Sequence, residues 1–129
     1  MKYKFYIFII LLCACSTKSN FNSSDIQSEL NQKFTKGKEL FEKKKYSRAK
    51  DEFDYILIND RGSDIGVQAR FYQAESLYML EQFEEAIASY DKVLQFSNDI
   101  SKIEESKFKI CQCYFELSIG IIEIKVIMI

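Results

Sequence analysis

One segment of the sequence occurs twice, and this repetition constrains the fold more than any other feature. Residues 37–57, shifted by 37 positions, align with residues 74–94 and keep the residue type at nearly every apolar position. The matched pairs are Gly37 with Ala74, Leu40 with Leu77, Tyr46 with Phe83, Ala49 with Ala86, Phe53 with Tyr90, Ile56 with Val93, and Leu57 with Leu94. A second equal shift brings Phe71 to Phe108 and Tyr78 to Phe115. Such a fixed period indicates stacked supersecondary units that bury their apolar faces against one another.

The apolar residues within each unit follow the period of a helix. Ile26, Leu30, Phe34, Gly37 and Phe41 recur at steps of three and four residues, which predicts an amphipathic helix. The chain contains no proline and only four glycines, so long uninterrupted helices are expected. We predict an all-α fold with five helices. The first ends near residue 44, the second is capped by Ser47 and includes residue 57, and the third and fourth cover residues 64–80 and 84–96. The fifth begins at a capping box at Ser101 and ends near residue 117.

The paired helices resemble the tetratricopeptide repeat at particular positions. Gly37 and Ala74 occupy its small residue, where the two helices of a repeat approach closely, and Ala49 and Phe53 reproduce its Ala-x-x-x-Phe step. The sequence departs from the pattern where Lys33 and Arg70 replace its Trp, where Arg61 and Asn98 replace its closing Pro, and in its period of 37 residues. The resemblance implies a helix-turn-helix solenoid of about two and a half repeats over residues 25–118.

The first residues have the pattern of an export signal. A short basic segment is followed by an apolar run, residues 5–12, that is far shorter than the roughly 20 residues needed to span a bilayer. The run ends in Leu12-Cys13-Ala14-Cys15, which resembles the bacterial lipobox. This resemblance implies a signal peptide over residues 1–14, lipidation of Cys15, and a flexible tether over residues 15–24. An ordinary cleaved signal with a chance cysteine is the alternative.

Together, the lipobox and the repeats resemble the BamD family of outer-membrane protein assembly lipoproteins. The likeness is carried by the run GKELFEKKKY at residues 37–46 and by residues 69–78 and 109–114. It covers roughly the amino-terminal half of such a protein. A generic tetratricopeptide protein would explain the apolar pattern equally well. The lipobox is therefore the feature that most favours the BamD family over other tetratricopeptide proteins.

The BamD resemblance implies a periplasmic scaffold that is lipid-anchored in the outer membrane as part of the BAM complex. Its expected partners are unfolded outer-membrane proteins and the barrel-forming assembly subunit. Two alternatives remain open at this point. One is a lipoprotein adaptor of another envelope machine, such as pilus assembly or the Tol–Pal system, and the other is a truncated, non-functional fragment.

The expected binding surface is a pair of aromatic rows along the first helix of each repeat. Row one contains Phe34, Phe71 and Phe108, and row two contains Phe41, Tyr78 and Phe115, seven residues further on. Seven residues make about two helical turns, so each pair shares a helix face. Lys38, Glu75 and Gln112 lie between the rows as polar contacts. The rows would suit an extended apolar peptide, whereas the simpler interpretation is that these rings only pack helix against helix.

The residue content argues against catalysis. The chain has no histidine, which removes the usual nucleophilic triads and zinc ligand sets. Cys111 and Cys113 diverge on a helix, and Cys111 is expected to be a buried thiol because it aligns with Gly37 and Ala74. Residues 33–50 carry eight Lys or Arg against two Asp or Glu, and this basic edge could hold a peptide carboxylate. We therefore predict no enzyme activity, metal, cofactor, nucleic acid or small-molecule substrate.

The last eleven residues do not continue the pattern. The repeat would place an aromatic residue at 120 and alanine at 123, but the chain has Gly120 and Glu123. Residues 119–129 form a β-branched apolar run without an evident helical period, and such a run promotes aggregation if it is exposed. We interpret this segment as an aberrant apolar tail that follows a truncation or frameshift after Ser118, or as a hydrophobic cap over the last helix.

Overall fold

The computed structural model describes residues 23–127, with side chains as far as Glu123, and this part of the chain is helical without strands. The helices are α2 (Ser23–Glu42), α3 (Tyr46–Asn59), α4 (Asp64–Met79), α5 (Phe83–Phe96) and α6 (Ile100–Ile127). The expected signal peptide and Cys15 lie outside the described residues. Of the expected tether, only Ser23 and Ser24 are described, and both belong to α2.

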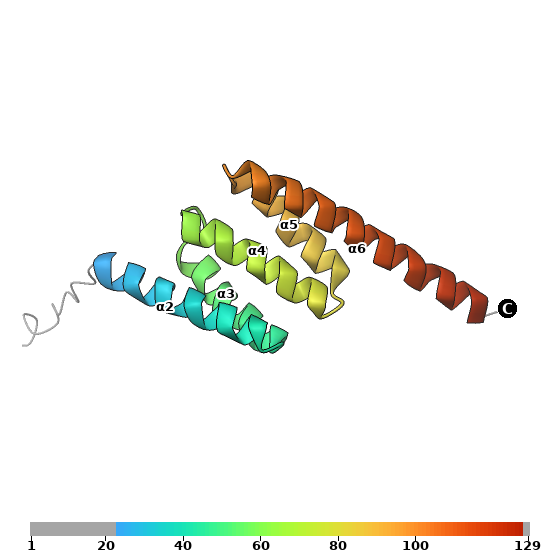
Figure 1. Cartoon of the computed structure of the whole chain (residues 1–129), viewed down its shortest axis with the longest axis horizontal. Coiled ribbons are helices and arrows are strands. Elements are labelled where there is room, and N and C mark those ends of the chain that lie inside the picture. The colour runs from blue at the N-terminus through green and yellow to red at the C-terminus, as the bar shows by residue number, and fades with distance from the viewer. Residues whose placement is uncertain (1–22, 128–129) are drawn as a thin grey trace, which may run out of the picture.

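Each helix packs against the next one along the chain, so the molecule is a stack of antiparallel neighbours. In Figure 1, α2, α4 and α6 lie towards the viewer, while α3 lies behind α2 and α4, and α5 behind α4 and α6. The pairs α2–α3 and α4–α5 form two repeats, and α6 is the first helix of a third. This arrangement confirms the all-α solenoid expected from the sequence period.

The turn inside each repeat is the same in both copies. Lys44 and Glu81, 37 residues apart, both adopt a left-handed backbone, with φ of 57° and 61°. The following residue then closes the helix end: Lys45 N–H donates to the Leu40 carbonyl at 2.8 Å, and Gln82 N–H to the Leu77 carbonyl at 2.9 Å. This left-handed helix ending usually employs glycine. The backbone therefore repeats more faithfully than the turn residues do.

Two predicted helix caps are wrong. Helix α3 begins at Tyr46 after Lys45, and no side chain caps it, so Ser47 lies inside the helix. At the start of α6 the Asp99 carboxylate accepts hydrogen bonds from the backbone N–H groups of Ser101 and Lys102, at 3.0 and 3.4 Å. Asp99 takes this position because a carboxylate is at least as good an acceptor at a helix start as the hydroxyl of Ser101. Ser63, by contrast, caps α4 by accepting from Gly66 N–H at 3.3 Å.

The core consists of two clusters joined along α4. The first is centred on Phe53 and Ile56 of α3, and the second on Tyr90 and Val93 of α5, and all four are fully buried. Gly37 lies at the α2–α3 crossing, as the repeat pattern predicts. A Cβ atom at Gly37 would lie only 2.7 Å from the Phe53 ring.

Helix α6 differs from the sequence prediction in two ways. It continues to Ile127 instead of ending near Leu117. No proline interrupts it, and a lone glycine inside a helix costs only about 1 kcal/mol. In addition, Cys111 is exposed although it was expected to be buried, and Cys113 is the buried thiol.

The repeat period explains the burial of α6. Its buried residues Ser106 and Cys113 lie 37 residues after Ala69 and Ser76, which are also fully buried. Cys111 instead follows Ala74, which packs with Ala86 and Tyr90 of α5. Within the described residues no helix follows α6, so the corresponding face of α6 has nothing to pack against.

Candidate functional site

The aromatic rows do not form one continuous exposed surface. Phe71, at their expected centre, is only 5% exposed and belongs to the core, so the expectation that it would be partly exposed is wrong. Phe34, Phe41 and Tyr78 are half-buried, in agreement with the expectation for these three. Phe71 is buried because its ring contacts Tyr90 of α5 edge-on, with centroids 6.0 Å apart.

Tyr72, which the repeat comparison passes over, joins the α2 and α4 members of the rows. Its ring lies 5.7 Å from Phe34, 6.0 Å from Phe41 and 5.9 Å from Phe71, each contact being edge-to-face. Such pairs contribute about 0.5–1.5 kcal/mol beyond their area burial. Thirty-seven residues to either side the chain has Thr35 and Lys109, so no repeated aromatic marks this position.

Lysine side chains cover the ring faces that remain open. The ammonium of Lys38 lies 5.5 Å from the Tyr72 centroid, that of Lys102 4.6 Å from Phe71, and that of Lys109 5.2 Å from Tyr78. These distances are within the range of a cation–π contact. Lys38 thus lies against Tyr72, whereas the contacts of Lys102 and Lys109 were not predicted. Neither lysine aligns with a basic residue in another repeat.

Glu75 is the polar centre of the α4–α6 junction. One carboxylate oxygen accepts a hydrogen bond from the Tyr90 hydroxyl, and the other pairs with Lys109 at 2.9 Å. Burial, followed by the adjacent Glu75 carboxylate, raises the pKa of Tyr90. The hydroxyl therefore stays protonated and donates throughout the physiological range. The half-buried Glu75 is thus occupied by partners from α5 and α6.

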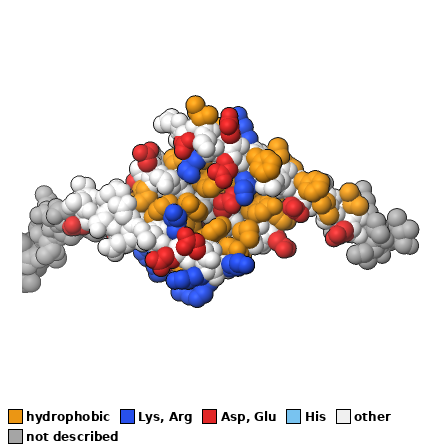
Figure 2. Space-filling model, in the orientation of Figure 1, with side chains coloured by type: hydrophobic (Ala, Val, Ile, Leu, Met, Phe, Trp, Pro, Cys, Tyr) orange, Lys and Arg blue, Asp and Glu red, His pale blue; other side chains and the backbone are white. Residues whose placement is uncertain are grey.

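The α6 members of the rows have a different environment. Phe108 and Phe115 are 62% and 64% exposed, and Tyr114, which lies outside the rows about 100° around the helix from Phe115, is 59% exposed. Figure 2 shows apolar side chains over the middle of the face that α2, α4 and α6 form and along α6, interrupted by charged groups. Exposed apolar residues grouped in this way commonly mark an interaction surface. The structure thus divides the eight expected residues into a packed group on α2 and α4 and an open group on α6.

The basic edge at residues 33–50 is partly neutralised by carboxylates within the fold. Lys33 and Lys36 approach the Glu52 carboxylate at 3.3 and 2.6 Å, and Lys50 pairs with Asp54 at 2.6 Å. Burial acts to raise the pKa of Glu52, but the two lysines outweigh it and hold that pKa below its ordinary value of 4.5. These contacts leave less of the expected positive edge available to a ligand.

Two other kinds of feature are absent from the described residues. Residues 23–127 contain no group of three or more His, Cys, Asp or Glu side chains placed to hold a metal ion. In the same range, no helix combines the length and apolarity required to cross a bilayer.

The chain is similar to a known protein. It is 35% identical over 81 residues to a Rickettsia prowazekii (strain Madrid E) protein described as "Outer membrane protein assembly factor BamD". The resemblance to BamD is confirmed. The alignment includes 63% of this chain but only 32% of the relative, so the chain spans about a third of that protein's length. Comparison with models of known protein families gives no match.

Proposed function

We propose that the chain acts as a periplasmic scaffold in outer-membrane β-barrel assembly, where it binds segments of unfolded outer-membrane proteins and a barrel-forming partner subunit. The observation that carries the proposal is the 35% identity to an outer membrane protein assembly factor over 81 residues. The half-buried and exposed aromatic rings of α2, α4 and α6 support it, because strands of outer-membrane barrels alternate apolar and polar side chains.

The surface proposed to receive such a segment is built from eight residues, which are the six rings of the aromatic rows and two polar neighbours. They are Phe34, Lys38, Phe41, Phe71, Glu75, Tyr78, Phe108 and Phe115. Because their burial differs, these residues have different proposed roles. Phe71 supports the surface from the core, whereas Tyr78 and Phe115 present ring area to a bound segment.

Binding is tested with a synthetic eleven-residue peptide that alternates aromatic and polar residues, measured by isothermal titration against the purified chain. We expect Phe115→Ala and Tyr78→Ala to weaken binding at least about threefold each, because buried aromatic anchors dominate interface energies. Tyr114→Ala is the matched control, since Tyr114 is an equally exposed aromatic about 100° around the same helix. Equal affinity for all four proteins would refute a peptide-binding role of the rows.

The proposed location is the periplasmic face of the outer membrane, with an anchor on Cys15. The support is the Leu12-Cys13-Ala14-Cys15 run, since several acyl chains together hold a protein stably on a membrane. Expression with radiolabelled palmitate is expected to label the parent chain and not Cys15→Ala. The Cys13→Ala variant is the control and should be labelled like the parent. Equal labelling of Cys15→Ala would contradict lipidation at this residue.

A further inference from the structure

A cavity separate from the aromatic rows lies between α3, α4 and α5. Its volume is about 530 Å³, and it is lined by none of the eight residues proposed for the aromatic surface. The lining combines three basic side chains with apolar ones, chiefly Arg61, Arg70, Lys92, Leu57, Ile58 and Phe96. Residues from both repeats and from the loop between them therefore meet here.

Arg70 is the unusual member of this group. It is only 8% exposed, and within the described side chains it forms no ion pair and donates no hydrogen bond. Burial, followed by the like charge of Arg61, lowers the pKa of Arg70. A charge that is largely removed from water and has no protein partner loses part of its hydration, so an anion that entered this cavity would offset some of that cost.

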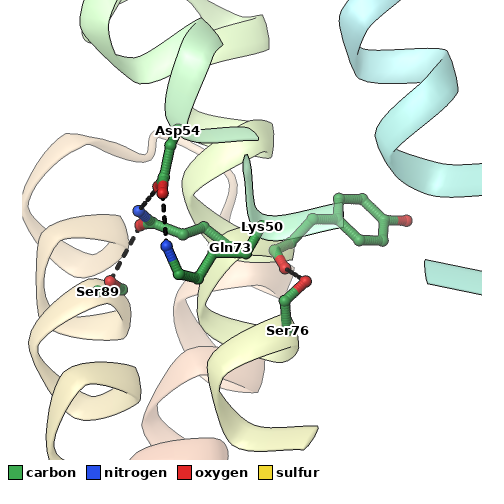
Figure 3. Close-up of polar contacts among 6 residues, drawn as sticks. Lys50, Asp54, Gln73, Ser76 and Ser89 are labelled. Atoms are coloured by element: carbon green, nitrogen blue, oxygen red, sulfur yellow. Dashed lines mark hydrogen bonds and ion pairs between the residues drawn. The ribbon is translucent and has the colours of Figure 1, made fainter. Parts of the chain in front are cut away.

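The nearest carboxylate in the cavity already has partners. Asp54 accepts hydrogen bonds from Lys50 at 2.6 Å and from the Gln73 side-chain amide, whose oxygen in turn accepts from Ser89 at 3.1 Å (Figure 3). Asp54 acts on Arg70 through its charge alone and does not form an ion pair with it. The cavity therefore keeps an excess of positive charge after the internal pairs are counted.

Apolar side chains border the basic group. Ile58 of α3 is 73% exposed and Phe96 of α5 is 55% exposed, and both line the cavity. A free inorganic anion would use the positive charge but gain nothing from these surfaces. Arginine combined with exposed apolar residues is the typical composition of the energetic centre of a protein interface.

We propose that this cavity binds a carboxylate side chain of a partner protein, next to a large apolar side chain that packs on Ile58 and Phe96. Arg70 and Arg61 hold the carboxylate, since the planar guanidinium matches its two oxygens. Lys92, exposed on α5, adds charge at the rim. The inference does not depend on the aromatic rows, because the two sites share no residue.

The probe is an acetylated and amidated peptide with one glutamate between leucines, and its twin carries glutamine instead. Isothermal titration against the full chain should show the glutamate peptide binding about tenfold more tightly, as expected for a partly desolvated charge pair. Arg70→Met and Lys92→Met should each reduce this preference. Arg48→Met is the matched control, because Arg48 is an exposed arginine of α3 outside the cavity, and it should keep the preference.

Each outcome of this experiment either supports or overturns the proposal. Lys92→Met changes an exposed residue, so it remains informative if Arg70→Met fails to fold. Equal affinity for the two peptides, or an undiminished preference in folded Arg70→Met, would overturn the proposal. If Arg70→Met does not fold, an undiminished preference in Lys92→Met would overturn it. Inorganic phosphate that displaces the glutamate peptide at or below the peptide's own concentration would show a site for small oxyanions and would also overturn it.

Discussion

Gly37→Ala tests the packing of the first repeat with the smallest possible change. A Cβ atom added at Gly37 would lie 2.7 and 2.8 Å from two atoms of the Phe53 ring. Cβ atoms in proteins essentially never approach other heavy atoms this closely. Phe53 is fully buried, and its ring is held by Phe34 at 5.9 Å and Tyr72 at 5.6 Å between centroids. Because the Phe53 ring is buried between these neighbours, we expect the added Cβ atom to push α2 and α3 apart.

Two opposing effects determine the expected magnitude. Replacing a helical glycine by alanine gains about 1 kcal/mol of helix propensity. Overpacking a rigid core costs about 1–3 kcal/mol, and the confined Phe53 ring places this site near the upper value. The net loss should be about 2 kcal/mol in the free energy of unfolding, which lowers the melting temperature of a domain this size by about 8 °C or more.

Urea unfolding followed by circular dichroism measures the change, and two other glycines serve as controls. A Cβ atom at Gly62 or at Gly120 would meet no atom within 4 Å. Gly62→Ala should leave stability unchanged or raise it by about 0.4–1 kcal/mol, and Gly120→Ala should not lower it. A Gly37→Ala chain as stable as the parent would show that α2 and α3 do not cross at this residue.

Three further predictions concern the same fold. Ala86→Leu should cost about 1–3 kcal/mol through overpacking, since Ala86 is fully buried, and a melting temperature at or above the parent's would refute this. Lys44→Gly should raise stability by about 0.5–1 kcal/mol in urea titrations, because its left-handed backbone strains a residue with a Cβ atom. Since folding lowers the pKa of Glu52, its stabilising effect is present above pH 4.5 and should fall away in more acidic titrations, unlike in Glu52→Gln.

The fold was predictable because it depends on local and repeated signals. The 37-residue period placed the helix pairs, and four of the five described helices end within about two residues of the expected position, a normal uncertainty for helix ends. The caps and turns were less predictable. Lys44 and Glu81 adopt a conformation that glycine usually signals, so the closed helix ends they form could not be recognised from residue type.

The candidate site was less predictable than the fold, because exposure depends on neighbours that the period does not specify. Phe71 and Phe108 are equivalent in the repeat, yet one is 5% exposed and the other 62%. Phe71 has Tyr90 of α5 beside it, whereas no described helix follows α6. The burial of Arg70 could not be predicted for the same reason. In the sequence, Arg70 is only a residue that replaces the tetratricopeptide Trp, whereas the fold shows that it is buried beside Arg61.

The contacts between the first helices of the repeats also differ in kind, and this affects how the proposed peptide surface would respond to conditions. Between α2 and α4, Phe34 and Phe41 contact Tyr72 through their rings, which does not depend on ionic strength, and Lys38 adds a single charged contact with Tyr72. Between α4 and α6, the charged side chains of Lys102 and Lys109 contact Phe71, Tyr78 and Glu75. Because salt screens charged contacts that are partly open to solvent, the α6 side of the surface should loosen at high ionic strength while the α2–α4 side persists. A ligand that spans all three helices would then lose affinity with added salt even if it carried no charge of its own.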